Sequence, residues 1–128
     1  MKTTEDLFWL AVNAYHEAQG ESIEGQIAVC KVVLNRVKKR KLSVKEVILQ
    51  EDQFSWHNGN KFPKLTDYKS LLTCFESAQK AIEEHENGDT LFGANLYYSD
   101  TMPEPPWWAL SPKVRKIVKI GRHTFFRE

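Results

Sequence analysis

Apolar residues recur every three or four positions through the first two thirds of the chain, which is the spacing of amphipathic helices. The first helix is expected to run from an N-cap at Thr3 or Thr4 to about residue 18, with Gly20 as its stop. The second is expected over about 23–38. Its apolar residues cover so much of its surface that we expect it to lie at the centre of the domain.

Two further helices are expected, with a long loop between them. Ser43 and Glu46 form a capping-box pattern ahead of a short helix that ends near Leu49. The stretch 50–69 is polar, aromatic and rich in turn residues, so it is expected to be an ordered loop. Loops of this length in a small domain are usually functional. A fourth helix is expected over about 70–86, where the helical spacing returns.

The last third of the chain has a different pattern. Leu96–Tyr98 is typical of a strand, and the apolar residues on either side of Gly121 predict a hairpin that turns there. No internal repeat or linker is visible, so residues 1–128 are expected to form a single domain. The predicted fold class is α+β, mostly helical, with a small β-hairpin or sheet near the C-terminus.

Composition and charge exclude several classes of protein. Hydrophobic residues make up 41% of the chain and charged residues 27%, which is ordinary for a globular domain. A net charge of +1 provides no broad basic field, so nucleic acid is not an expected partner. There is no apolar run long enough to span a membrane and no secretion signal. We therefore expect synthesis in the cytoplasm and no stable membrane insertion.

The cysteines and histidines do not suggest a metal site. Cys30 and Cys74 lie far apart, each on the apolar side of a predicted helix, where a buried free thiol is the usual state. No spacing of cysteine and histidine residues is typical of metal ligands. Neither a metal ion nor another cofactor is expected.

Glu17 is the main candidate for acid–base chemistry. At 100° per residue it falls on the flank of the apolar side of the first helix, half buried and half open, whereas His16 falls on the opposite side. The negative end of the helix dipole and partial burial both raise the pKa of a carboxyl group at this position. Such a group can donate a proton near neutral pH. Taken alone the signal is weak, because a glutamate near a helix end is usually a surface residue.

Aromatic residues make up 12% of the chain, and two segments combine rings with polar groups as a saccharide site does. The first lies in the long loop. Its polar members are expected to hydrogen-bond a sugar from one side of a cleft, while its rings either line that cleft or fill the core. These residues are Gln53, Phe54, Ser55 and Trp56.

The second segment is Tyr97–Tyr98. Adjacent strand residues point to opposite faces, so only one of the two rings can face the cleft, opposite the loop. His123 follows the hairpin turn and is a further substrate-binding candidate, although histidines at turns are more often structural.

A second carboxylate, which most glycosidases use, is hard to find. Glu21 follows four residues after Glu17, but its simplest role is to stabilise the N-terminus of the second helix. Glu24 is expected to face solvent. Asp52 and Asp100 lie in loops from which they could enter a cleft.

Six blocks of the sequence resemble one known family: residues 14–21, 24–29, 33–37, 53–55, 93–98 and 120–127. The family is that of the SleB/CwlJ-type cell-wall hydrolases of spore cortex lysis. The blocks occur in the family's order along nearly the whole chain. The first block is fairly specific, whereas the later ones are short.

The resemblance implies a lysozyme-like α+β catalytic domain in which Glu17 is the catalytic residue. The family cleaves peptidoglycan glycan strands between N-acetylmuramic acid and N-acetylglucosamine. It is expected to act as a lytic transglycosylase that leaves 1,6-anhydro ends, and such chemistry needs only one acid–base group. A true muramidase of the same fold is the alternative. Other classes left open are a wall-binding module without catalysis and a structural phage or spore-coat component.

Two departures from the family pattern bear on these expectations. Gln19 stands where the family commonly has arginine, which removes a possible salt bridge. Spore members carry a secretion signal and often a wall-binding module, and neither is expected in this chain. A domain of that kind resembles a phage or prophage endolysin, a monomer released to the wall with the help of a holin.

Overall fold

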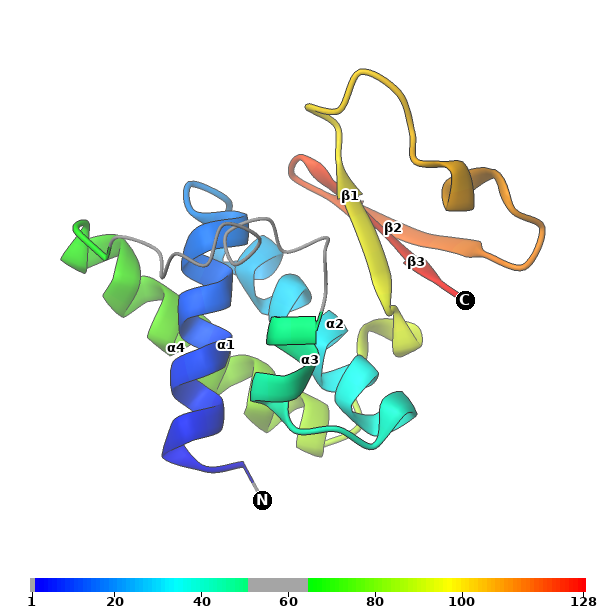
Figure 1. Cartoon of the computed structure of the whole chain (residues 1–128). Coiled ribbons are helices and arrows are strands. Elements are labelled where there is room, and N and C mark those ends of the chain that lie inside the picture. Colours follow the sequence, from blue (N-terminus) through cyan, green and yellow to red (C-terminus); the bar gives the residue numbers. More distant parts are fainter. Residues whose placement is uncertain (1, 51–64) are drawn as a thin grey trace.

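The computed structural model describes residues 2–50 and 65–128. Within them four helices, α1 to α4, form one part of the molecule, and a small antiparallel sheet lies against it (Figure 1). The predicted α+β class is confirmed. No helix among the described residues is long and apolar enough to cross a membrane.

α1 (Thr4–Ala18) and α2 (Ile23–Arg40) form the centre of the helical part. A capping box between Thr3 and Asp6 starts α1. Ser22 caps α2, with its Oγ atom accepting a hydrogen bond of 3.1 Å from the Gly25 amide. Every residue of α2 from Gly25 to Leu34 is buried, as expected for a central helix.

α3 (Val44–Gln50) and α4 (Tyr68–Glu86) complete the helical part. α4 begins two residues earlier than the sequence pattern predicts, because Asp67 is its N-cap and accepts a hydrogen bond of 3.0 Å from the Ser70 amide. Both cysteines are buried and free, as expected. They belong to the main core, which α1, α2, α3 and α4 share.

The sheet contains β1 (Leu96–Ser99), β2 (Arg115–Ile120) and β3 (His123–Arg127) in the order β1-β3-β2. β2 and β3 form the predicted hairpin around Gly121, and β1 pairs antiparallel with β3. Two short 3-10 turns, Leu91–Gly93 and Trp107–Leu110, lie between the helices and β2.

One face of the sheet packs on the helices. Phe125 is fully buried there, in a second core cluster with residues of α1 and α2 such as Ala18 and Val29. Tyr97, the β1 partner of Phe125, packs against both core clusters. This face therefore brings β1 and β3 up to the C-terminal end of α1, which carries Glu17.

Two polar anchors hold the sheet on the helices. Asn35 of α2 donates hydrogen bonds to the carbonyl groups of Thr90 and Ala94 at 2.9 and 2.7 Å, and Arg36 donates one to Asn95 at 2.8 Å. These bonds fix the segment that enters β1. At the other end of the sheet, Glu21 binds the turn between β2 and β3.

Candidate active site

Glu17 lies in the last turn of α1, where α2 and β1 meet that helix. Its side chain is half-buried, and its Oε1 atom is completely buried. Burial raises the pKa of Glu17 to about 7, while the charge of Arg36 and hydrogen bonding by the Tyr97 hydroxyl group both lower it. Near neutral pH this carboxyl group can both hold and release a proton.

The flank position of Glu17 and its raised pKa agree with the expectations from the sequence. Burial is the main cause of the raised pKa. His16, on the preceding position of α1, is exposed, as its place on the opposite side of the helix predicts.

Arg36 is a buried cation beside this carboxyl group. The residue is only 1% exposed, and its Nε atom donates to the Asn95 carbonyl oxygen at 2.8 Å. Burial lowers the pKa of Arg36 to about 10, at which it is still charged near neutral pH. A fixed positive charge here stabilises the carboxylate form of Glu17 after it has given up its proton.

No role for Arg36 was expected from the sequence. A signal was present, because Arg36 continues the helical row of Val29 and Val32, both of which are fully buried. A charged residue in such a row must have a partner.

Tyr97 forms the β1 side of the site. Its ring makes an edge contact with His123, with centroids 5.2 Å apart, and a tilted contact with Phe125 at 5.6 Å. Burial, followed by the charge of Glu17, raises the pKa of Tyr97 well above its ordinary value. The phenol therefore stays protonated and can donate a hydrogen bond toward Glu17.

Glu21 has a structural role that differs from the expected one. Its side chain is 7% exposed. Oε1 accepts a hydrogen bond of 2.9 Å from the Arg122 amide, and Oε2 accepts one of 3.2 Å from Arg122 Nε. From the sequence, Glu21 was expected to stabilise the N-terminus of α2 or to cap its amide groups; the structure shows that Ser22 is the cap and that the Glu21 side chain bonds to the hairpin.

The contact of Glu21 with the hairpin also explains Gly121. That residue has φ +58, and a Cβ atom there would lie 2.5 Å from Glu21 Oε1. His123 Nδ1 is 3.6 Å from the same oxygen, and the histidine is 6% exposed. His123 thus lies between Glu21 and Tyr97.

The remaining candidates from the sequence have different positions. Tyr98 points to the other face of the sheet, where it stacks on Phe126 and contacts Trp108. Asp100 pairs with Lys119 at 3.3 Å near the surface. Five loop candidates lie outside the described residues: Asp52, Gln53, Phe54, Ser55 and Trp56. Within residues 2–50 and 65–128, no group of three or more His, Cys, Asp or Glu side chains could hold a metal ion.

The chain has a family match that covers most of its length. The model of a family described as Cell Wall Hydrolase matches residues 20–126. This chain belongs to the cell wall hydrolase family. The resemblance inferred from the sequence blocks is therefore confirmed. The matched residues include Glu21, Arg36 and Tyr97 but begin after Glu17.

Curated relatives extend the similarity through α1. The spore cortex-lytic enzyme of Bacillus cereus is 31% identical over 123 residues, which is 94% of this chain and 43% of that protein. The Bacillus subtilis enzyme of the same name is 29% identical over 126 residues, 96% of this chain and 38% of that protein. The chain thus spans less than half the length of these relatives.

Solved structures show the same fold. The catalytic domain of the germination-specific lytic transglycosylase SleB from Bacillus anthracis superposes with a TM-score of 0.74 at 26% identity, covering 98% of this chain and 97% of that one. The catalytic domain of the Bacillus cereus SleB protein also gives 0.74, at 27% identity, covering 99% and 93%. The architecture of helices and sheet is thus that of the SleB catalytic domain.

Proposed function

We propose that this domain is a peptidoglycan lytic transglycosylase with Glu17 as its single acid–base group. The observation that carries the proposal is the half-buried Glu17 carboxyl group, whose pKa burial raises to about 7, in a fold shared with the SleB catalytic domain. The bond cleaved is the one between N-acetylmuramic acid and N-acetylglucosamine. Glu17 acts in two steps, first as an acid and then as a base.

In the first step protonated Glu17 donates its proton to the glycosidic oxygen, and the bond from that oxygen to C1 of the muramic residue breaks. Positive charge then develops at C1, and the new Glu17 carboxylate stabilises it. In the second step the C6 hydroxyl of the same sugar attacks C1, and Glu17 takes the hydroxyl proton. The products are a 1,6-anhydromuramic end and a free N-acetylglucosamine end, and the enzyme regains its proton.

The surroundings of Glu17 fit both steps. Burial favours the protonated form that starts the reaction, while Arg36 and Tyr97 favour the carboxylate that follows. Glu21, the nearest alternative carboxylate in the sequence, is occupied by Arg122. An attacking group that belongs to the substrate needs no second carboxylate to position water. We expect Gln53, Phe54 and Ser55 to bind the sugar opposite Tyr97.

The role of Glu17 is tested with Glu17→Gln, which keeps the shape of the side chain and removes the acid. Loss of an acid–base group commonly lowers a rate by about 10²–10⁴-fold. We expect a loss in at least that range in the clearing of purified sacculi. Glu24→Gln is the matched control, since Glu24 is exposed on α2. A Glu17→Gln enzyme with a tenth of the normal rate would exclude Glu17 as the acid.

The product test separates a transglycosylase from a muramidase. Sacculi are digested in H₂¹⁸O and the fragments are weighed. A transglycosylase yields anhydromuropeptides without ¹⁸O, whereas a hydrolase puts ¹⁸O on a reducing muramic end. If only labelled reducing ends appear, the transglycosylase proposal fails and Asp52 and Asp100 become candidates for the second group. A wall-binding module without catalysis would release neither product.

The proposed biological setting is phage or prophage lysis with release through a holin. Its test is expression of the untagged chain in a bacterial host with and without a co-expressed holin. Lysis is expected only with both proteins, and only when Glu17 is intact. Lysis by the chain alone would remove the need for a holin. The expected monomer is checked by light scattering of the purified protein.

A further inference from the structure

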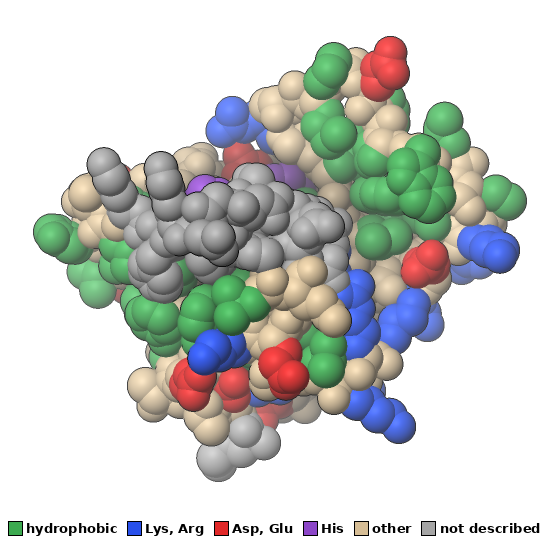
Figure 2. Space-filling view, viewed as in Figure 1, with side chains coloured by type: hydrophobic (Ala, Val, Ile, Leu, Met, Phe, Trp, Pro, Cys, Tyr) green, Lys and Arg blue, Asp and Glu red, His purple; other side chains and the backbone are tan. Residues whose placement is uncertain are grey.

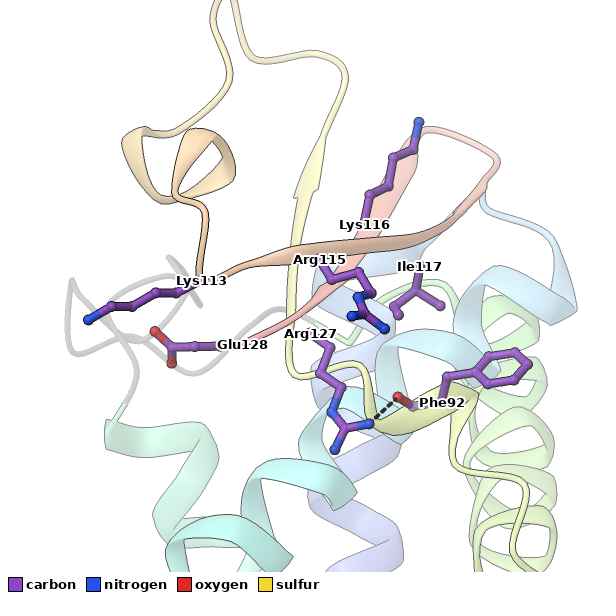
Figure 3. A pocket seen from close by; sticks show the side chains of 7 residues that line it. All are labelled: Phe92, Lys113, Arg115, Lys116, Ile117, Arg127 and Glu128. Carbon is purple, nitrogen blue, oxygen red and sulfur yellow. Dashed lines mark hydrogen bonds between the residues drawn. The ribbon is translucent and has the colours of Figure 1, made fainter.

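A groove with many basic side chains lies at the end of the sheet where β3 finishes. Two adjoining cavities of about 490 and 550 Å³ form it, and they share Phe92, Arg127 and Glu128. Figure 3 shows the first cavity, between β2, the end of β3 and the turn that carries Phe92. The second continues to the C-terminal end of α2. Neither cavity is lined by Glu17, Tyr97 or His123, so the groove is separate from the candidate active site.

The charge of this groove is out of proportion to that of the chain. The whole sequence has a net charge of +1. One acidic side chain, Glu128, lines the groove together with six basic ones: Lys38, Lys39, Lys113, Arg115, Lys116 and Arg127. Figure 2 shows Lys and Arg side chains gathered on this part of the surface, at the lower right.

Most of these cations have no acidic partner in the described part of the chain. Lys39 is 3.8 Å from Glu128, and both side chains are more than half exposed, at 53% and 59%. The other five basic side chains form no ion pair with another described residue. Such a concentration of like charge repels itself, and an anion bound along the groove would relieve the repulsion.

Phe92 adds an aromatic surface to the groove. It is 79% exposed, and both it and Leu91 have φ 54, a region that residues other than glycine rarely adopt. The hydrogen bonds from Asn35 to Thr90 and Ala94, on either side of the turn, hold this conformation. Arg127 lies against the turn and donates to the Phe92 carbonyl oxygen at 3.5 Å. A strained backbone that presents a ring to solvent is typical of a ligand site.

We infer that this groove binds an anionic wall polymer in which phosphodiester groups alternate with polyol or sugar units. Lysine and arginine side chains around the groove pair with phosphates of the polymer, and Phe92 packs on a sugar or polyol unit between them. The proposed function supports this choice of polymer, because it locates the enzyme at a cell wall. The groove then holds the domain on the wall while Glu17, in a separate site, acts on the glycan.

The test measures binding of poly(glycerol phosphate) to the whole chain by titration calorimetry at 50 and 200 mM NaCl. The groove variant is Lys113→Gln/Arg115→Gln/Lys116→Gln, whose three positions are all exposed. The control, Lys45→Gln/Lys69→Gln/Lys80→Gln, removes the same charge from exposed positions of α3 and α4. Circular dichroism melting confirms that each variant is folded.

We expect the groove variant to lose at least tenfold in affinity and the control less than twofold. The slope of log K against log salt should fall in magnitude by about 2 in the groove variant, if each cation neutralises one phosphate. Phe92→Ala should weaken binding without changing that slope. No binding by the wild-type chain, or equal losses in the groove and control variants, would overturn the inference.

Two further arms distinguish a wall polymer from nucleic acid, and binding in the groove from catalysis at Glu17. Single-stranded DNA with the same number of phosphates is expected to bind at least tenfold more weakly. Equal or tighter binding of DNA, with the same sensitivity to the groove variant, would overturn the assignment to a wall polymer.

Cleavage of sacculi stripped of phosphate polymers should be unchanged in the groove variant, while clearing of walls that carry them should slow. If the wild-type protein cleaves neither the stripped sacculi nor the walls that carry the polymer, the proposed function is refuted, but the binding result is unaffected.

Discussion

Replacing Glu17 with glutamine should stabilise the folded protein as well as inactivate it. The unfolded chain ionises Glu17 with a pKa of 4.5, whereas burial raises the folded value to about 7. Between these two values the folded state binds more protons than the unfolded state, so the free energy of unfolding falls as the pH rises. Glutamine imitates the protonated side chain and cannot ionise. The variant therefore avoids this loss.

The size of the effect follows from the pKa difference. One pKa unit corresponds to about 1.4 kcal/mol, so the shift of Glu17 is equivalent to about 3 kcal/mol. At about pH 4 Glu17 is mostly protonated in both the folded and the unfolded state. The difference in stability between Glu17→Gln and wild type should then be only the difference between a neutral glutamic acid and a neutral glutamine. It should then grow by about 3 kcal/mol on going to about pH 7, and change little above pH 8. This gain is a substantial fraction of the total stability of an ordinary domain.

Urea unfolding followed by circular dichroism at pH 4, 5, 6, 7 and 8 measures the difference between variant and wild type. Glu24→Gln is the control, because it makes the same substitution at an exposed position of α2. A Glu17→Gln difference that stays constant from pH 4 to 8 would refute the argument. It would mean that the carboxyl group is hydrated in the folded state and has no raised pKa.

Three further outcomes are expected. Tyr97→Phe removes a hydrogen bond that lowers the pKa of Glu17. The alkaline limb of the pH–rate profile is set by loss of the Glu17 proton, so it should move to higher pH in this variant. A shift to lower pH would contradict the argument. Hydrogen bonds from Arg122 lower the pKa of Glu21, so the stability that this carboxylate contributes is present above its ordinary pKa and is lost as the pH falls. Urea unfolding should therefore show that Glu21→Gln is destabilising at pH 7 and much less so near pH 3. Activity on sacculi should be unchanged in EDTA, because the proposed chemistry needs only a carboxyl group, and recovery by added zinc or calcium of activity lost in EDTA would show otherwise.

The helical part could be predicted because its signals are local. Caps such as Ser22 and apolar rows with helical spacing lie within one or two turns of each other, and the structure follows them closely. The start of α4 was missed because its cap, Asp67, lies in a segment without apolar periodicity. The hairpin could be located from Gly121, since glycine is the residue type that most readily adopts the positive φ of such a turn.

The candidate site could be predicted only in part. The angular position of Glu17 on α1 placed it on a half-buried flank. Its neighbours come from distant parts of the chain, and no local pattern pairs Glu17 with Arg36 or Tyr97. The same holds for Glu21 and Arg122, which are 101 positions apart. Such contacts depend on how the sheet docks onto the helices, which the spacing of apolar residues does not determine.

Gln19, where the family pattern commonly has arginine, makes a contact whose contribution to stability can be measured. Its Nε2 atom donates to Asp67 Oδ2 at 3.3 Å, and Asp67 is the N-cap of α4. An arginine at position 19, as the family pattern suggests, would place a cation beside this exposed carboxylate. Surface ion pairs contribute little, so we expect Gln19→Arg to raise Tm by no more than about 4 °C at low salt.

The contact with Asp67 is tested by combining the two changes. In an Asp67→Asn background the gain from Gln19→Arg should disappear, and in 1 M NaCl it should shrink, because salt screens exposed charges. A gain that is the same with Asp67 and with asparagine, or the same at both salt concentrations, would mean that arginine does not act through this pair. Gln19 is the C-cap of α1 and has an extended backbone, so the gain would then come from local contacts at the end of that helix. Either result would make the arginine of the family pattern a local feature of the end of α1, unrelated to the contact between α1 and α4.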